Sequence, residues 1–282
     1  MFLFGLYLLY APDFKGGPPS DQMSSSGLLR RCISNTHRDV RYVKGGTCIT
    51  ADQRLHALED LVYSLKVMLE NANVVYWIDS GTLLGVYRAQ QLVPWDYNAD
   101  FGITMSGLEY LRTTSDDVIE MPDGYELTVF NSSLYRAGTT SSGVPARFVD
   151  TEFGFYANIF AFENFKGLFK DDVRPATAPL IQEVEVGNGV VVESLMGPTP
   201  SEFWHRCVHC PNVEMEEEED EDSDMTTTSN ATVVKHFRVP QDWIFPLRTC
   251  RLELFEVMCP AQMAPYLMFI FGNRFLTPEI WE

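Results

Sequence analysis

Two aspartates and an asparagine alternate in the stretch LVPWDYNADFGIT, residues 92–104. Asp96 and Asp100 are four residues apart, and Asn98 stands between them, where a third carboxylate would continue the alternation. Alternate residues of a strand point to the same face, and carboxylates placed in this way can share a Mg²⁺ ion. The spacing therefore predicts a divalent-metal site that includes Asp96 and Asp100. On spacing alone, the alternative is a solvated turn with capping acids.

A second segment, DSGTLLG at residues 79–85, is suited to binding phosphate. It follows a short apolar run at 74–78, which predicts a buried strand. Gly81 permits a tight turn, and Thr82 or Ser80 can cap the helix that follows. The backbone N–H groups at a helix N-terminus bind phosphate, and a metal held beside them suits phosphoryl transfer. A plain helix cap is the alternative.

The stretch YWIDSGTLLGVYRAQQLVPWDYNADFGI resembles the central motif of the LicD and fukutin-related family. Three later segments, GFYANIFAF, IFPLRTCRLELFEVMCP and FGNRFLTP, are also similar to that family, so the resemblance covers residues 47–282 apart from an acidic insertion. It implies a nucleotidyltransferase fold. It also implies transfer of a phosphorylated group, such as phosphocholine or ribitol 5-phosphate, from a CDP-linked donor onto a glycan.

The resemblance assigns roles to individual residues. Gly81 and Thr82 would form the phosphate-binding turn, and Arg88 would lie near the donor phosphates or support the turn. A Mg²⁺ or Mn²⁺ ion would have its ligands at Asp96, Asn98 and Asp100. Catalytic roles would fall to Asp96, Asp100 and Asn158, with position 158 as third ligand or as base for the acceptor hydroxyl.

The sequence departs from the family pattern at Asn98 and Asn158, where the family has acids. An amide oxygen can ligate a hard cation, but it carries no charge and cannot act as a base near neutral pH. We therefore expect weaker metal binding and weak or absent catalysis. The alternative is a rearranged site in which Asp79 or Asp150 supplies the missing carboxylate.

Three functional hypotheses follow from these residues. The first is a metal-dependent phosphotransferase that uses a CDP-linked donor and a glycan acceptor. The second is a catalytically impaired relative that binds a glycan or a protein partner, and Asn98 and Asn158 motivate it. The third is a metal-dependent glycosyltransferase that uses Asp96 and Asp100. A nucleic-acid ligand is not expected, because the formal net charge is −18 and the sequence has no basic patch.

The elements that must position these residues predict an α/β (α+β) fold, a single domain with a nucleotidyltransferase-like mixed β-sheet flanked by helices. Thr50 and Gln53 form a predicted capping box for a long helix, and Ser106 and Glu109 form a second one. Further strands are expected at 101–104, 125–130, 146–150 and 153–161. We also expect a hairpin at 184–192 and helices at about 82–89 and 261–271.

Composition divides the chain into three parts. Residues 1–12 are apolar and predict a signal-anchor or a truncated hydrophobic segment, with a buried strand as the alternative. Residues 13–46 are rich in Gly, Pro and Ser and predict a linker or stem. The domain spans 47–282 and includes an acidic insertion at 213–232, where nine acids fall within residues 214–224. Like charges repel, so this insertion is expected to be disordered.

Six cysteines permit three disulfides, but their pairing does not follow from the sequence. The segment HRCVHC, residues 205–210, leaves zinc as an alternative, because Cys207 and Cys210 have a suitable spacing and His205 and His209 are close. One or more of the other four cysteines could complete such a site. The sequons at Asn131 and Asn230 and the apolar N-terminus indicate the secretory pathway, with the Golgi lumen as the expected compartment.

Overall fold

The computed structural model describes residues 21–23, 29–33, 37–114, 118–130, 144–166, 194–198, 208, 212–214, 233–235 and 237–277. Several predicted features lie outside these residues. They are the N-terminal apolar segment, the hairpin at 184–192, most of the acidic insertion, both sequons, Cys207 and Cys210. Among the described residues, no helix is long and apolar enough to cross a membrane.

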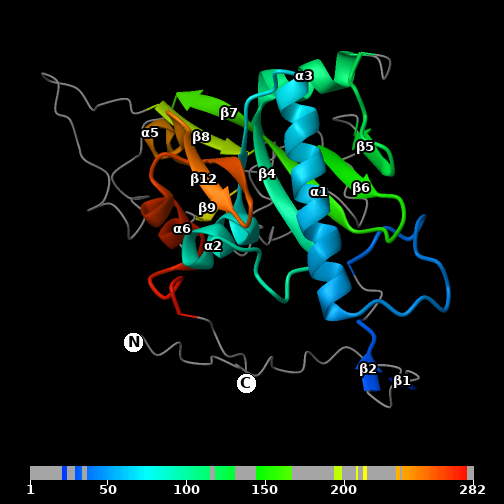
Figure 1. Ribbon diagram of the computed structural model, residues 1–282. Coiled ribbons are helices and arrows are strands. Elements are labelled where there is room, and N and C mark those ends of the chain that lie inside the picture. The colour runs from blue at the N-terminus through cyan, green and yellow to red at the C-terminus, as the bar shows by residue number, and fades with distance from the viewer. Residues whose placement is uncertain are drawn as a thin grey trace, which may run out of the picture.

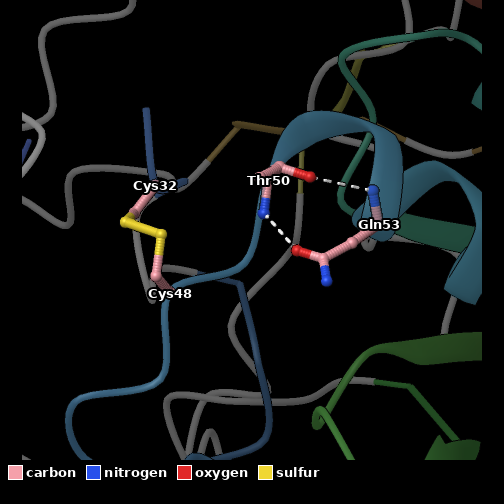
Figure 2. Close-up of a disulfide and its surroundings, with 4 residues drawn as sticks. All are labelled: Cys32, Cys48, Thr50 and Gln53. Carbon is pink, nitrogen blue, oxygen red and sulfur yellow. Dashed lines mark hydrogen bonds between the residues drawn. A yellow bond between two sulfur atoms is a disulfide. The ribbon is translucent and has the colours of Figure 1, made fainter. Parts of the chain in front are cut away.

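The long helix α1, Ala51–Asn71, lies across one face of the sheet (Figure 1). Its first turn has the predicted capping box: the Gln53 backbone N–H donates to Thr50 Oγ1, and the Thr50 N–H donates to Gln53 Oε1 (Figure 2). The apolar face is buried at positions that recur every three or four residues, namely Leu58, Leu61, Val62, Leu65, Met68 and Leu69.

The main sheet is mixed and has the strand order β11-β8-β7-β4-β3, with β6 and β5 branching from β7. Its strands are β3 (Tyr76–Ile78), β4 (Asn98–Thr104), β5 (Tyr125–Val129), β6 (Ala146–Asp150), β7 (Tyr156–Lys166), β8 (Ser194–Pro198) and β11 (Val239–Pro240). Strand β7 runs parallel to β4, and the other pairings are antiparallel. A mixed sheet flanked by helices confirms the predicted fold class.

Four further helices lie among the described residues: α2 (Ser80–Ala89), α3 (Met105–Thr113), α5 (Gln241–Ile244) and α6 (Met263–Phe271). A hairpin of β12 (Arg248–Leu252) and β13 (Phe255–Cys259) packs beside them. Two short pairs are separate from the main sheet: β1 (Asp21–Met23) with β2 (Leu29–Arg31), and β9 (Asn212–Glu214) with β10 (Val233–Lys235). The last pair lies at the two ends of the acidic insertion, and β9 includes its first two residues, 213 and 214.

Two predicted helix starts differ from the structure. The N-cap of α2 is Asp79, which accepts from the Ser80 N–H, in place of Ser80 or Thr82. The N-cap of α3 is Thr104, whose side chain accepts from the Gly107 N–H, in place of Ser106. In both cases a nearer oxygen meets the free N–H groups of the first turn, so the helix begins earlier than predicted.

The core contains one close contact between neighbouring strands. Trp77 in β3 pairs with Gly102 in β4, and a Cβ atom at Gly102 would lie 2.2 Å from the Trp77 ring. Trp77 is fully buried and makes edge-to-face contacts with Phe162 and Phe245. The missing side chain at Gly102 is what allows the indole to lie flat against β4.

The end of the predicted linker contacts the domain. The Asp39 N–H donates to the Gly154 carbonyl at 2.7 Å, and Arg38 donates to the Phe153 carbonyl at 2.6 Å. Arg41 forms an ion pair with Glu126 in β5. Residues 38–41 are therefore packed on the turn before β7 and on the edge of β5, although their composition predicts a stem.

Two disulfides are present among the described cysteines. Cys32 is bonded to Cys48 just before α1 (Figure 2), and Cys250 is bonded to Cys259 across the β12–β13 hairpin. These four cysteines were the candidates to complete a zinc site with Cys207 and Cys210. Because each is paired in a disulfide, none of them has a thiolate to offer, and that part of the zinc alternative is wrong.

Candidate functional site

The N-terminus of α2 lies against the acidic loop. A Cβ atom at Gly81 would be 2.8 Å from Asp96 Oδ2, so the glycine brings the backbone of the first helical turn directly against this carboxylate. The preceding residue, Ser80, has a φ of 46°, a left-handed conformation that is uncommon for a side chain of this kind. Uncommon backbone conformations recur at functional sites, which makes this turn a candidate.

The loop that carries Asp96 is tied to the domain at two points. The Asp96 N–H donates to the Val93 carbonyl at 3.0 Å, and the Arg54 guanidinium donates to the Pro94 carbonyl. The same guanidinium lies 4.7 Å from the centre of the Tyr97 ring. These contacts hold the half-buried Asp96 opposite Gly81.

Thr82 connects α2 to β4. Its Oγ1 accepts a hydrogen bond from the Asp100 backbone N–H at 2.9 Å, and the side chain is buried. The Asp79 N–H donates to the Asp100 carbonyl at 2.8 Å. The start of α2, at Asp79 and Thr82, is thus joined to β4 through the backbone N–H and carbonyl groups of Asp100.

A row of polar side chains crosses three strands at this point. Register pairs Arg147 in β6 with Asn158 in β7, and Asn158 with Asp100 in β4. Arg147 Nε donates to Asn158 Oδ1 at 3.1 Å, and Asn158 Nδ2 donates to Asp100 Oδ1 at 3.0 Å. Asn98 Nδ2 donates to the same oxygen of Asp100, also at 3.0 Å. Asn98 and Asn158 therefore both donate to Asp100, whereas the Asp96 side chain lies beside Gly81 and shares no hydrogen bond with these three among the described residues.

Three carboxyl groups near this point hold their protons more tightly than usual. Burial, together with the charge of Asp100, raises the pKa of Asp96 to about 7, although the charges of Arg54 and Arg88 lower it. Burial likewise raises the pKa of Asp100 to about 6, against the hydrogen bonds from Asn158 and Asn98. Burial raises the pKa of Asp79 to about 7. Groups with such values can exchange protons near neutral pH.

Arg88 contacts the end of the described chain. Its Nε donates to the Phe275 carbonyl at 2.7 Å, and its guanidinium also reaches the Thr277 carbonyl at 3.3 Å. Its charge still lowers the pKa of Asp96. These contacts join Arg88 to the C-terminal end of the described chain, and its two implied roles, near the donor phosphates or in support of the turn, both stay predictions.

The two substitute carboxylates behave differently. Asp79 is fully buried and accepts hydrogen bonds from the Ser80 N–H and the Tyr266 hydroxyl, and its backbone adjoins Asp100. Asp150 accepts from the Glu152 N–H at 2.8 Å, in the turn that leads to β7. Asp79 is thus part of the site's framework, whereas Asp150 has a local role in a turn.

The residues present do not fit a divalent cation as they are arranged. Asp100 Oδ1 accepts hydrogen bonds from the amide N–H groups of Asn98 and Asn158, and Asn158 Oδ1 accepts from Arg147. A cation needs oxygen lone pairs aimed at it, and here N–H groups take that place. Among the described residues, no three His, Cys, Asp or Glu side chains form a group that could hold a metal ion.

Three contributors were missed by reasoning from the sequence. Arg54, Arg147 and Tyr266 come from α1, β6 and α6, far from the central motif in the chain. Arg147 could have been found only from the register of β6 against β7. Arg54 carried one signal, a charged residue that directly precedes the apolar face of α1, and Tyr266 carried none.

A comparison with known families matches the segment that holds this site. The family model described as LicD/FKTN/FKRP, nucleotidyltransferase domain, covers residues 73–179. That range contains every residue to which a site role was assigned, from Gly81 to Asn158. The match confirms the predicted resemblance to the LicD and fukutin-related family.

Individual curated proteins also resemble this chain over part of its length. Mannosyltransferase regulator 4 of Saccharomyces cerevisiae is 24% identical over 166 residues, which is 56% of this chain and 14% of that protein. Ribitol 5-phosphate transferase FKRP of Homo sapiens is 43% identical over 49 residues, which is 17% of this chain and 10% of that protein. The mouse protein of the same name matches equally well. The chain thus covers a small part of these relatives, and the matches support a family of glycan-modifying phosphotransferases.

Proposed function

We propose that this chain binds a CDP-linked donor and a glycan at the junction of α2 and β4, and transfers a phosphorylated alditol or phosphocholine group to a glycan hydroxyl. The observation that carries the proposal is the contact of Gly81 with Asp96. That contact brings the first turn of α2, where helical N–H groups lack intrahelical acceptors, close to a carboxyl group whose pKa is raised to about 7. The family match over residues 73–179 supports the same class of reaction.

The reaction would be a displacement at phosphorus. The glycan hydroxyl oxygen forms a bond to the distal phosphorus of the donor, the bond from that phosphorus to the bridging oxygen breaks, and CMP leaves with the bridging oxygen. Asp96 accepts the hydroxyl proton, because Asn158 cannot. The α2 N–H groups stabilise the phosphate charge, and Arg54 and Arg88 add positive charge near Asp96. No step is assigned to a metal.

The experiment combines the purified chain with CDP-ribitol or CDP-choline and a panel of glycans. Mass spectrometry should detect a glycan that gains the phosphorylated group, together with free CMP. The matched control is Asp96→Asn, which keeps the shape of the side chain and removes the proton acceptor. Transfer of a sugar without phosphate would indicate the glycosyltransferase hypothesis, and equal turnover by Asp96→Asn would exclude the proposed base.

A second candidate is a binding protein without transferase activity. The observation in its favour is that Asn98 and Asn158 both donate to Asp100 Oδ1, so the site has an acid–amide network where the family pattern has acids. It predicts that calorimetry detects binding of the donor or the glycan while no product forms. Turnover by the unaltered chain would exclude it.

We also propose that the protein resides in the secretory pathway, in the Golgi lumen. The disulfides Cys32–Cys48 and Cys250–Cys259 support an oxidising compartment. Expression of the full-length protein in cells, followed by a shift assay with a thiol-reactive label, tests the proposal. Free thiols at these four cysteines in freshly lysed cells would contradict it.

A further inference from the structure

The orientation of the Asn158 amide is fixed by its two neighbours. Arg147 Nε can only donate a hydrogen bond, and an ionised Asp100 can only accept. The Asn158 atom 3.1 Å from Arg147 must therefore be the oxygen, and the atom 3.0 Å from Asp100 must be the nitrogen. A reversed amide would set N–H against N–H on one side and oxygen against oxygen on the other. Arg147 is held in place in turn by its position 4.3 Å over the Tyr156 ring.

Asn98 reaches the same oxygen from two residues earlier in β4. Its Nδ2 lies 3.0 Å from Asp100 Oδ1 and 3.4 Å from the Ala99 carbonyl, so both nearby acceptors favour the nitrogen at this position. The Asp100 Oδ1 atom consequently receives two amide N–H groups. A carboxylate that receives two donors is stabilised in its charged form without a cation.

We propose that Arg147, Asn158 and Asn98 take the place of a divalent cation at Asp100, and that Arg147 is the positioning residue that keeps the Asn158 oxygen turned away. Two amide N–H groups donate to the Asp100 carboxylate, and the Arg147 guanidinium binds the oxygen of one of these amides. Their positive charge stabilises the ionised Asp100, which would otherwise need a cation beside it. The inference goes beyond the proposed function and holds whether or not transfer takes place, because it concerns the resting site.

The proposal explains why the two asparagines occur together. A carboxylate at position 158 or 98 would place an oxygen about 3.0 Å from Asp100 Oδ1. Two carboxylate oxygens at that distance repel unless a cation or a proton lies between them. With amides at both positions, each contact with Asp100 Oδ1 is an attractive N–H···O hydrogen bond.

The first test is a titration of the intact chain with Mn²⁺, followed by electron paramagnetic resonance of the free ion. The unaltered chain should show no stoichiometric site, whereas Asn98→Asp combined with Asn158→Asp should bind one Mn²⁺ per chain. Binding by the unaltered chain that is lost in Asp100→Asn would overturn the proposal. So would a double variant that has the native circular dichroism spectrum and binds no Mn²⁺.

If the double variant does not fold, the single variant Asn158→Asp replaces it. It should be destabilised relative to the unaltered chain in the presence of EDTA and should regain stability when Mn²⁺ is added. The unaltered chain should show no such response to Mn²⁺. An equal response in both would overturn the proposal, because the asparagine would then make no difference to the metal.

The second test isolates the positioning role of Arg147. In an Asn98→Asp background, Arg147→Met should tighten Mn²⁺ binding by on the order of 10-fold, because the Asn158 oxygen can then turn towards the ion. Arg147→Lys, which keeps a donor and a charge, should give no gain. In an Asn98→Asp background that also carries Asn158→Ala, Arg147→Met should give a smaller gain, because only the charge changes. Equal gains with and without the Asn158 amide would refute the positioning role.

Discussion

The backbone N–H of Asp100 donates to the Oγ1 of Thr82 at 2.9 Å, and this bond joins the first turn of α2 to β4. Thr82 is buried, so water cannot replace its hydroxyl. Thr82→Val should lower the free energy of unfolding by about 1–3 kcal/mol, since a buried N–H would lose its partner. Thr82→Ser keeps the hydroxyl and should be milder. Urea denaturation measures both, and an equal loss in the two variants would mean that the hydroxyl is not responsible.

A substitution at Gly81 should weaken ligand binding while leaving the stability of the fold almost unchanged. Gly81→Ala places a methyl group against the end of the Asp96 side chain, which can rotate away, and alanine favours the helix. We expect the free energy of unfolding to change by less than about 1 kcal/mol, while the affinity for CDP-ribitol falls. Isothermal titration calorimetry measures that affinity.

The matched control for Gly81 is Gly85, in the same helix. A Cβ atom there would lie 2.4 Å from the Gln91 carbonyl oxygen and 2.8 Å from the Val93 nitrogen, which are backbone atoms that cannot rotate away. Gly85→Ala should therefore lower stability by about 1–3 kcal/mol, as overpacking does. An unchanged donor affinity in Gly81→Ala would remove this turn from the proposed binding site.

Asp79 should make the stability depend on pH. Burial raises its pKa to about 7, against the hydrogen bonds from Ser80 and Tyr266, and the charge of Asp100 raises it as well. An unfolded aspartate titrates near 3.8. The folded state therefore binds more protons between these values, so the free energy of unfolding falls as the pH rises from about 4 to about 7 and then levels off.

The variant Asp79→Asn keeps a good N-cap and removes this titration. Its stability should fall less steeply across the same pH window than that of the unaltered chain. Some slope should remain, because Asp96 and Asp100 also have raised pKa values. Urea denaturation at about pH 5, 6, 7 and 8 gives the slopes. Identical slopes in the two proteins would show that Asp79 is charged in the folded state throughout.

Arg88 is expected to hold the C-terminal end of the described chain in place. Its guanidinium meets the Phe275 and Thr277 carbonyls. The amides of these residues are protected by hydrogen bonds to Gly272 and Arg274. Arg88→Met removes charged hydrogen bonds worth about 1.5–3 kcal/mol, so hydrogen exchange at Phe275 and Thr277 should accelerate by about 10-fold or more.

The control for Arg88 is Arg112→Met, which breaks a surface ion pair with Glu109 and should leave exchange at the C-terminal end unchanged. Mass spectrometry of deuterated peptides supplies the comparison. If Arg88→Met leaves exchange unchanged but weakens binding of CDP-ribitol, the phosphate-contact role that the resemblance implies would replace the supporting role.

Features with a local cause could be predicted from the sequence. The capping box of Thr50 and Gln53 depends on residues three apart, and the structure has both of its hydrogen bonds. A strand is also predicted at 146–150, and these are the bounds of β6. The convergence of Asn98, Asp100 and Asn158 was predictable because a recognisable motif carries two of the three residues.

Features with a distant cause could not be predicted. Arg147 acts on Asn158 through the register of two antiparallel strands, and Tyr266 reaches Asp79 from a helix near the other end of the chain. The start of α2 at Asp79 depends on the left-handed conformation of Ser80, which its residue type does not indicate. The orientation of the amides at the site depends on these neighbours, so residue types alone did not reveal it.

The contact between Trp77 and Gly102 has a consequence for how this domain can change through evolution. Any side chain at position 102 would overlap the indole, whereas a smaller residue at position 77 would leave an empty space beside β4. Each single replacement should lower stability, and a paired replacement of large-to-small with small-to-large should be tolerated better. The two positions should therefore covary among homologous sequences, and a glycine at 102 should accompany a tryptophan at 77.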